Sequence, residues 1–318
     1  MYVGTKPTGV IKTAPDDFVV REMHNGRPLV PVATTDIQGE QFECTEFVVT
    51  KHNFESQRLL ESIAEALQVS LENVTSYGKK DKYAVTTQKI VIVGSYTPSF
   101  SHSRINMRHR GEALRPARPG PHEGNSFSIL VRTDASRPPE GSRFRNLFGP
   151  QRFGRGSVEV GKFLLTGDDE RALGLLFDDE QQRIKLLQVR HHMQYKTVYE
   201  ALYSKEYREQ RQFMILQWQS YLWNRVAMKA TTEFLPIWSE ETASLYDHIW
   251  NPEQIDEAML AESHTFNRPV WVDVGQHAII EAPEGFRHEF ILRSGAYATS
   301  FLSSLYDLTD ASQTYKTA

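Results

Sequence analysis

Three lysines surround one aspartate in the stretch Gly78-Lys79-Lys80-Asp81-Lys82. Nearby positive charge favours the ionised form of a carboxylate, so Asp81 is expected to be charged at neutral pH. The following residues are β-branched and lead into Ile90-Val91-Ile92-Val93, which predicts a buried strand. A carboxylate on a loop that feeds a strand is well placed for catalysis at a cleft. A solvated turn explains the same residues, and composition alone favours that simpler interpretation.

Arginine is concentrated in two other parts of the chain, residues 102–118 and residues 142–158. The candidates for contacts with an RNA backbone are Arg104, Arg108, Arg110, Arg143, Arg145 and Arg155. Arginine clusters suit phosphate binding, although a solvated charged loop explains the first cluster equally well. Aromatic residues interleave with the second cluster and favour a functional role. Because the formal net charge is −4, any RNA contact is expected to come from such local patches.

Length and composition set the broad class. The 318 residues are enough for one large domain or two smaller ones, and 40% hydrophobic residues can fill a globular core. No apolar run approaches the length of a membrane span, and we expect no signal peptide. Cys44 is the only cysteine, which excludes an intrachain disulfide and a cysteine-cluster zinc site. These features favour a cytoplasmic protein.

The elements that must position Asp81 alternate between strands and helices. A strand entered from a turn is predicted within residues 16–22, and a second strand from Phe42 to Thr50. Apolar residues at helical spacing up to Leu67 predict a helix. Asn53 is a candidate cap for that helix. The order strand, helix, loop, strand predicts an α+β protein rather than a parallel doubly wound one.

The second half of the chain is expected to be mainly helical from Gly161, after a strand from Gly124 to Arg132. His191 and His192 are adjacent, so they point to different faces of a helix and make a poor metal pair. We expect no metal. Residues 233–283 are acidic, with Arg268 as the only Lys or Arg, so this segment is poorly suited to bind RNA. A lid, a strut or a protein contact is expected there.

Residues 78–88, Gly-Lys-Lys-Asp-Lys-Tyr-Ala-Val-Thr-Thr-Gln, resemble the G-x-K-D-[KR]-x-A-V-T-x-Q signature of the TruD family of pseudouridine synthases. Four further stretches resemble that family in the same order. These are residues 12–22 around Asp-Asp-Phe-Val-Val-Arg-Glu, residues 124–132, residues 146–154 (Asn-Leu-Phe-Gly-Pro-Gln-Arg-Phe-Gly) and residues 290–300. Lys51, Asn53 and the helix stretch 219–224 also match family positions.

The resemblance implies a pseudouridine-synthase-type catalytic domain with a mixed, mainly antiparallel sheet flanked by helices. It implies a discontinuous catalytic domain, residues 1–232 and 284–318, interrupted by a reduced insertion at residues 233–283. Two features depart from the family. The insertion is short, and only thirteen residues separate Arg132 from Asn146, where relatives carry a helix.

By the same resemblance, Asp81 is the nucleophile of the family and Lys12 its active-site lysine, which would hold the carboxylate ionised and in place. Phe148 and Tyr297 would flank the target base, and Asn146 would contact the uracil or the ribose. The remaining substrate-binding candidates are Gln151, Arg152 and Lys82.

The activity implied is the isomerisation of a uridine in RNA to pseudouridine, in this family typically at position 13 of a tRNA. The reaction needs no cofactor, which agrees with the lack of a Gly-rich nucleotide loop. An alternative is an RNA-binding or RNA-folding protein that keeps the fold with altered or lost catalysis. A hydrolase using Asp81 would need a second carboxylate, for which Glu22 is a candidate. The sequence leaves the RNA, the uridine, the route of Asp81 and the oligomeric state open.

Overall fold

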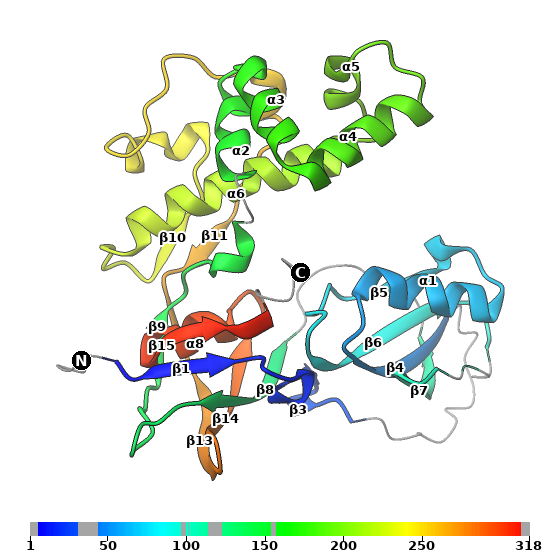
Figure 1. The fold of residues 1–318 in the computed structure, drawn as a ribbon, viewed down its shortest axis with the longest axis vertical. Coiled ribbons are helices and arrows are strands. Elements are labelled where there is room, and N and C mark those ends of the chain that lie inside the picture. The colour runs from blue at the N-terminus through cyan, green and yellow to red at the C-terminus, as the bar shows by residue number, and fades with distance from the viewer. Residues whose placement is uncertain are drawn as a thin grey trace. The chain divides into compact units, whose positions relative to one another are not determined.

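The computed structural model describes residues 6–30, 44–96, 100, 102–113, 123–153 and 157–312. Contacts within the chain divide it into two units, residues 1–144 with 273–318, and residues 145–272. The first unit contains most of the strands and the second contains most of the helices (Figure 1). The expected α+β class is therefore confirmed.

The first unit is built on an eleven-stranded sheet in which seven strands run in the order β13-β14-β8-β2-β6-β4-β7. Its pairs are antiparallel except for β2 with β6 and β1 with β15. The strands are β1 (Thr8–Ile11), β2 (Phe18–His24), β3 (Arg27–Pro28), β4 (Cys44–His52), β5 (Val74–Ser76), β6 (Val85–Val93), β7 (Ile105–Ala113), β8 (Gly124–Arg132), β13 (Gly275–Ala282), β14 (Gly285–Arg293) and β15 (Asp307–Asp310). The mixed, mainly antiparallel sheet expected from the sequence is thus present.

Helix α1 (Ser56–Leu67) packs on one face of the sheet, where β6, β4 and β7 lie side by side (Figure 1). Its buried side chains Leu59 and Ile63 pack with alternate residues of β4 and β6, because the helical and strand periodicities each present one apolar face. The predicted cap is wrong: the side chain of Glu55, not Asn53, accepts from the N–H of Arg58. Asn53 is instead left-handed, with φ of 46°, and its N–H donates to the carbonyl of Ala84.

A second α-helix described in the first unit, α8 (Ala298–Leu305), buries Phe301 against Phe290 of β14, with their ring centroids 4.8 Å apart. The chain then enters β15, which pairs in parallel with β1. This pairing brings the end of the described chain beside its beginning. Residues 133–142, between β8 and β9, contain no helix, as the short spacing in the sequence implied.

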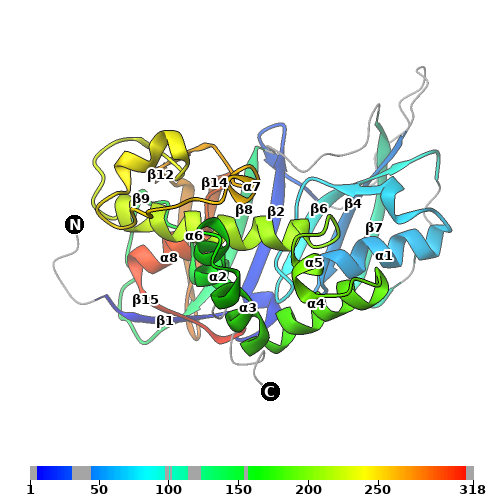
Figure 2. The same ribbon diagram turned by 90° about the horizontal axis from the view of Figure 1, so that it is seen from above.

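In the second unit α2 packs against the long helix α6 (Arg208–Ala227), and α3 packs against α2 (Figure 2). The other elements are α2 (Ser157–Leu165), α3 (Asp169–Asp178), α4 (Glu180–His192), α5 (Val198–Leu202), α7 (Glu257–Leu260) and the paired strands β10 (Phe234–Pro236) and β11 (Asn267–Pro269). Short strands β9 (Arg143–Arg145) and β12 (Trp271–Asp273) lie where the chain passes from one unit to the other. Helix α2 approaches α6 so closely that a Cβ on Gly161 would lie 2.0 Å from the carbonyl oxygen of Met214. Only glycine fits there.

The acidic segment does not form a core separate from these helices. Trp238, Tyr246 and Trp250 are buried in the same cluster as Trp218 and Leu222 of α6. Residues 233–272 therefore belong to the same compact unit as the helices that precede them, because aromatic residues of the acidic segment cover those helices. The insertion expected at residues 233–283 stays a prediction.

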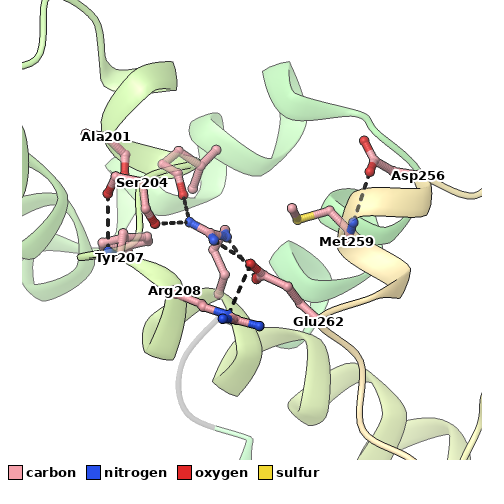
Figure 3. Close-up of polar contacts among 9 residues, drawn as sticks. Ala201, Ser204, Tyr207, Arg208, Asp256, Met259 and Glu262 are labelled. Carbon is pink, nitrogen blue, oxygen red and sulfur yellow. Dashed lines mark hydrogen bonds and ion pairs between the residues drawn. The ribbon is translucent and has the colours of Figure 1, made fainter.

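A buried ion pair fixes this segment to α6 (Figure 3). The Arg211 guanidinium binds both oxygens of Glu262, at 3.0 Å and 2.5 Å, and also donates to the carbonyls of Leu202 and Ser204. Arg208 approaches the same carboxylate at 3.7 Å. Part of the acidity noted in the sequence thus balances the charge of α6.

Replacing Glu262 with Ala is expected to lower the free energy of unfolding by about 3–5 kcal/mol, because it leaves the buried Arg211 charge uncompensated. Urea unfolding of the full chain measures this change. Glu253 is an exposed acid of the same segment, and its replacement with Ala is the matched control, expected to cost less than about 0.5 kcal/mol. Equal effects of the two changes would contradict a structural role for the pair.

No helix among the residues described is both long and apolar enough to cross a membrane. Likewise, no group of three or more metal-ligating side chains occurs in the described part of the chain.

Candidate active site

Asp81 lies in the loop that joins β5 to β6, and neighbouring elements hold this loop on several sides. The hydroxyl of Ser56 accepts from the N–H of Lys80 at 3.0 Å and donates to its carbonyl at 2.8 Å. The hydroxyl of Tyr83 donates to the carbonyl of Thr13 at 3.1 Å. The Asp81 side chain is nevertheless 38% exposed. The loop therefore combines a fixed main chain with a carboxylate that a substrate can reach.

Lys12 lies immediately after β1 and points its ammonium at this carboxylate. Its Nζ is 3.3 Å from Oδ2 of Asp81, although 69 residues separate the two in sequence. The Lys12 side chain is 4% exposed, and its Nζ lies 4.3 Å from the centre of the Phe18 ring. The structure thus brings together the two residues that the sequence marked as catalytic candidates.

The main chain of Lys12 adopts an uncommon conformation, with φ of 58°. A non-glycine residue in the left-handed region carries a strain of about 1–3 kcal/mol and persists where the surroundings over-determine it. At Lys12 the surroundings are the ring of Phe18 and two carboxylates. In this conformation the ammonium of Lys12 points at Asp81.

The second carboxylate is that of Asp310, which the sequence did not indicate. Its Oδ2 is 3.5 Å from Nζ of Lys12, and its Oδ1 accepts from the N–H and hydroxyl of Ser312. Asp310 is beside Lys12 because β15 pairs with β1 in a register that places it opposite Ile11. No local sequence motif predicts such a strand pairing. The Lys12 ammonium therefore holds two carboxylates, of which Asp81 is the more exposed.

Lys51 reaches the same loop from β4. Its side chain is fully buried, and its Nζ donates to the main-chain carbonyls of Asp81 at 2.6 Å and of Phe54 at 2.8 Å. Burial lowers the pKa of Lys51 to about 8, and the Asp81 carboxylate opposes part of this shift. The sequence marked Lys51 only as a matching position, with no role.

Glu22, the carboxylate considered for a hydrolase, is committed elsewhere. It accepts from Nζ of Lys80 at 2.5 Å and from the N–H of Lys89 at 2.9 Å. Its side chain is 3% exposed. A buried carboxylate with these partners is not available to protonate a leaving group, so the hydrolase alternative loses its candidate partner for Asp81.

Tyr297 and Lys82 also belong to the first unit. Tyr297 is half-buried and precedes α8, where its carbonyl accepts from the N–H groups of Ser300 and Phe301. Lys82 is exposed, one residue after Asp81. Tyr297 therefore lies just before α8, and Lys82 lies in the loop that leads into β6.

The candidates from residues 146–154 belong to the second unit. Asn146 is 1% exposed, and its Oδ1 is buried without a hydrogen-bond partner in the described structure. Phe148 is 5% exposed, with its ring edge-on to Trp223 and the Arg268 guanidinium 4.0 Å from its centre. Helix α6 fixes the main chain here, because Asn224 accepts from the N–H of Phe148 and donates to its carbonyl.

Arg152 lies in the short turn Pro150–Arg152, which also contains Gln151. The Arg152 guanidinium lies 5.2 Å from the centre of the Phe213 ring, and Gln217 donates to its carbonyl. The second unit thus holds an amide and an aromatic ring in a fixed main-chain setting. Such groups recognise bases in RNA-binding proteins.

The arginines proposed from composition have different surroundings. Arg104 and Arg108 are exposed on or beside β7, and Arg110 pairs with Glu46 at 3.1 Å. Arg143 is exposed near Asp273. Arg145 donates to the carbonyls of Ala227 and Ala230, so its guanidinium holds the C-terminal end of α6. Arg155, and Arg115 and Arg118 of the first cluster, lie outside the described residues.

A comparison with protein-family models matches residues 2–214 to tRNA pseudouridine synthase D (TruD). The chain is 32% identical over 186 residues to the probable tRNA pseudouridine synthase D of Thermococcus sibiricus. That match covers 52% of this chain and 42% of the relative, so the chain spans less than half of the relative's length.

A second relative matches along nearly the whole chain. The tRNA pseudouridine synthase D of Shewanella oneidensis is 25% identical over 353 aligned residues, which cover 98% of this chain and 90% of that protein. A crystal structure of the presumed tRNA pseudouridine synthase D of Methanosarcina mazei superposes with a TM-score of 0.59 at 18% identity. It covers 98% of this chain and 96% of that one. This likeness confirms the fold.

Proposed function

Because the chain belongs to the tRNA pseudouridine synthase D (TruD) family, we propose that it isomerises a uridine in tRNA to pseudouridine. The observation that carries this proposal is the approach of Lys12 to Asp81, at 3.3 Å, on the loop whose residues match the family signature. A held, accessible carboxylate beside an ammonium is a suitable nucleophile or base. The loop and Lys12 are distant in sequence, so their meeting is an observation independent of the motif.

In the proposed reaction the N1–C1′ bond of uridine breaks, the uracil rotates, and a C5–C1′ bond forms. The proton leaves C5 and N1 gains one, so the product is an isomer of the substrate and no cofactor is consumed. Asp81 either attacks the sugar or abstracts its 2′ proton. Lys12 orients the carboxylate in both routes through the contact of its ammonium with Oδ2.

The target base must first leave the stacked RNA, which costs a few kcal/mol. We propose that the extruded base stacks on Phe148 and Tyr297. Stacking contributes about 1–3 kcal/mol per base and would offset part of this cost. Asn146 is proposed to contact the uracil or the ribose. The support is its buried Oδ1, a polar atom that has no partner in the described structure and would gain one from a bound nucleoside. Gln151, Arg152 and Lys82 complete the proposed substrate contacts.

The RNA backbone is proposed to meet the arginines that remain exposed, Arg104, Arg108 and Arg143. Arg110, Arg145 and Arg155 are further candidates from the same two clusters. The ties of Arg110 to Glu46 and of Arg145 to α6 make these two the weaker candidates. By the family resemblance we propose uridine 13 of a tRNA as the target and the cytoplasm as the location.

Carbodiimide mapping of pseudouridine in RNA from cells with and without this protein tests the function. We expect one tRNA position to lose its signal when the protein is absent, and that position identifies the substrate. Unchanged signals at every position would contradict the proposal and favour an RNA-binding or RNA-folding role.

A further inference from the structure

Lys51 is buried without the partner that a buried lysine usually has. Its side chain is fully buried, and its hydrogen bonds in the described structure go to the main-chain carbonyls of Asp81 and Phe54. Removing an ammonium from water is costly unless it is paired with an opposite charge. Two neutral carbonyls compensate this cost only in part, and burial accordingly lowers the pKa of Lys51 to about 8.

Lys89, on the adjacent strand β6, shows the ordinary arrangement. It is also buried, but its Nζ pairs with the carboxylate of Glu46 at 3.0 Å. The two lysines thus differ in what they bind: Lys89 binds a carboxylate of the sheet, and Lys51 binds the main chain of the loop that carries Asp81. A fold that needed only to bury a lysine would resemble the Lys89 site.

Three residues between the end of β4 and the start of α1 contact the loop that carries Asp81. Lys51 binds the carbonyl of Asp81, the N–H of Asn53 donates to the carbonyl of Ala84, and Ser56 binds both main-chain groups of Lys80. Asn53 does this in a strained left-handed conformation. Lys51 alone of the three brings a charge. The charged groups that act on its ammonium are Asp81 and Glu55, which attract it, and Lys80, which repels it.

We propose that Lys51 is a positioning residue for the isomerisation proposed above, and this inference rests on that function. Its ammonium fixes the main chain of Asp81 and adds a second positive charge on the side of the loop away from solvent. Lys12 acts on the carboxylate directly, whereas Lys51 acts through the peptide that carries it. A displacement of about 1 Å in a catalytic group costs about 100-fold in rate, which sets the expected effect.

The test replaces Lys51 with Met, which keeps the length and apolar volume of the side chain and removes the charge and the hydrogen bonds. We expect kcat for pseudouridine formation in a tRNA transcript to fall about 100-fold, with KM unchanged within about threefold. Hydrogen exchange of the peptide covering residues 78–85, measured without RNA, is expected to become faster. Lys89→Met is the matched control and should leave kcat and this exchange within about threefold of the original, because Glu46 keeps Arg110 as a partner.

A second variant, Ser56→Ala, keeps the proposal testable if the Lys51 variant does not fold. Ser56 is the first residue of α1 and its loss removes only the two bonds to Lys80. Faster exchange of residues 78–85 with a lower kcat and an unchanged KM is expected. Faster exchange with a normal kcat would overturn the positioning role.

The Lys51→Met variant tests the positioning role directly. A kcat near the original value, or exchange that does not change, would overturn the proposal. Absence of pseudouridine formation by the unaltered protein is a different result, and it would overturn the proposed function itself. The exchange experiment needs neither RNA nor activity, so these two failures are distinguished.

Discussion

Replacing Asp81 with Asn is expected to abolish pseudouridine formation, with a loss of roughly 10⁴-fold or more in kcat, as for the removal of other essential catalytic groups. The amide has the size of the carboxylate but lacks its charge, so it can neither attack the sugar nor take a proton. Lys12 keeps Asp310 as a partner at 3.5 Å in this variant, so the fold is expected to survive. Tritium release from C5-labelled uridine in RNA measures the loss, and RNA binding is expected to remain.

Asp134→Asn is the matched control, because Asp134 is exposed on the loop after β8. It should release tritium at the original rate. Full tritium release by the Asp81 variant would show that the loop carboxylate is not catalytic. A parallel loss of RNA binding would place Asp81 in substrate recognition instead.

Replacing Lys12 with Met is expected to lower kcat by about 10²–10³-fold, the cost of removing one preorganised electrostatic partner from an active site. Without the ammonium, the carboxylates of Asp81 and Asp310 lose their shared cation, and the side chain of Asp81 loses the hydrogen bond that orients it. Because Lys12 is 4% exposed, we expect it to make little contact with RNA and KM to change little. Multiple-turnover rates at varied concentrations of a tRNA transcript give kcat and KM separately.

Lys6 supplies the control for this prediction, since it is an exposed lysine on the segment leading to β1 and binds the carbonyl of Ser303. Lys6→Met should retain kcat and KM. If Lys12→Met instead raised KM and kept kcat, Lys12 would be a contact for the RNA and not a partner of the carboxylate.

The sequence predicted the part of the site that depends on local chemistry. The lysines around Asp81 and the β-branched residues after it placed the carboxylate at the entrance of β6, as observed. The α+β class could be predicted for a similar reason, because apolar residues repeat with different spacings in strands and in helices. The resemblance of residues 12–22 to the N-terminal stretch of the family then singled out Lys12.

What could not be predicted depends on pairing between distant segments. Asp310 meets Lys12 only because β15 lies parallel to β1, a contact between residues nearly 300 positions apart. The bond from Lys51 to the Asp81 carbonyl depends on where the main chain of the loop lies, which side-chain types do not encode. Asn53 was wrongly predicted as a helix cap, because its side-chain chemistry suits a cap but its main chain is used to hold Ala84.

The core of the second unit shows a related limit. Charge marked residues 233–283 as distinct, but charge describes the surface of a segment and not its core. The aromatic residues Trp238 and Trp250 bury themselves with α6, and Arg211 pairs with Glu262 across the same interface. Packing therefore joins residues that composition separated.

The most direct test of the function is nucleoside analysis of an unmodified tRNA transcript after incubation with the purified protein and no added cofactor. We expect one uridine to become pseudouridine, at position 13 by the family resemblance, and the Asp81→Asn protein to form none. A transcript that is bound by the protein but contains no pseudouridine would contradict the assignment of Asp81 and Lys12 as a catalytic pair.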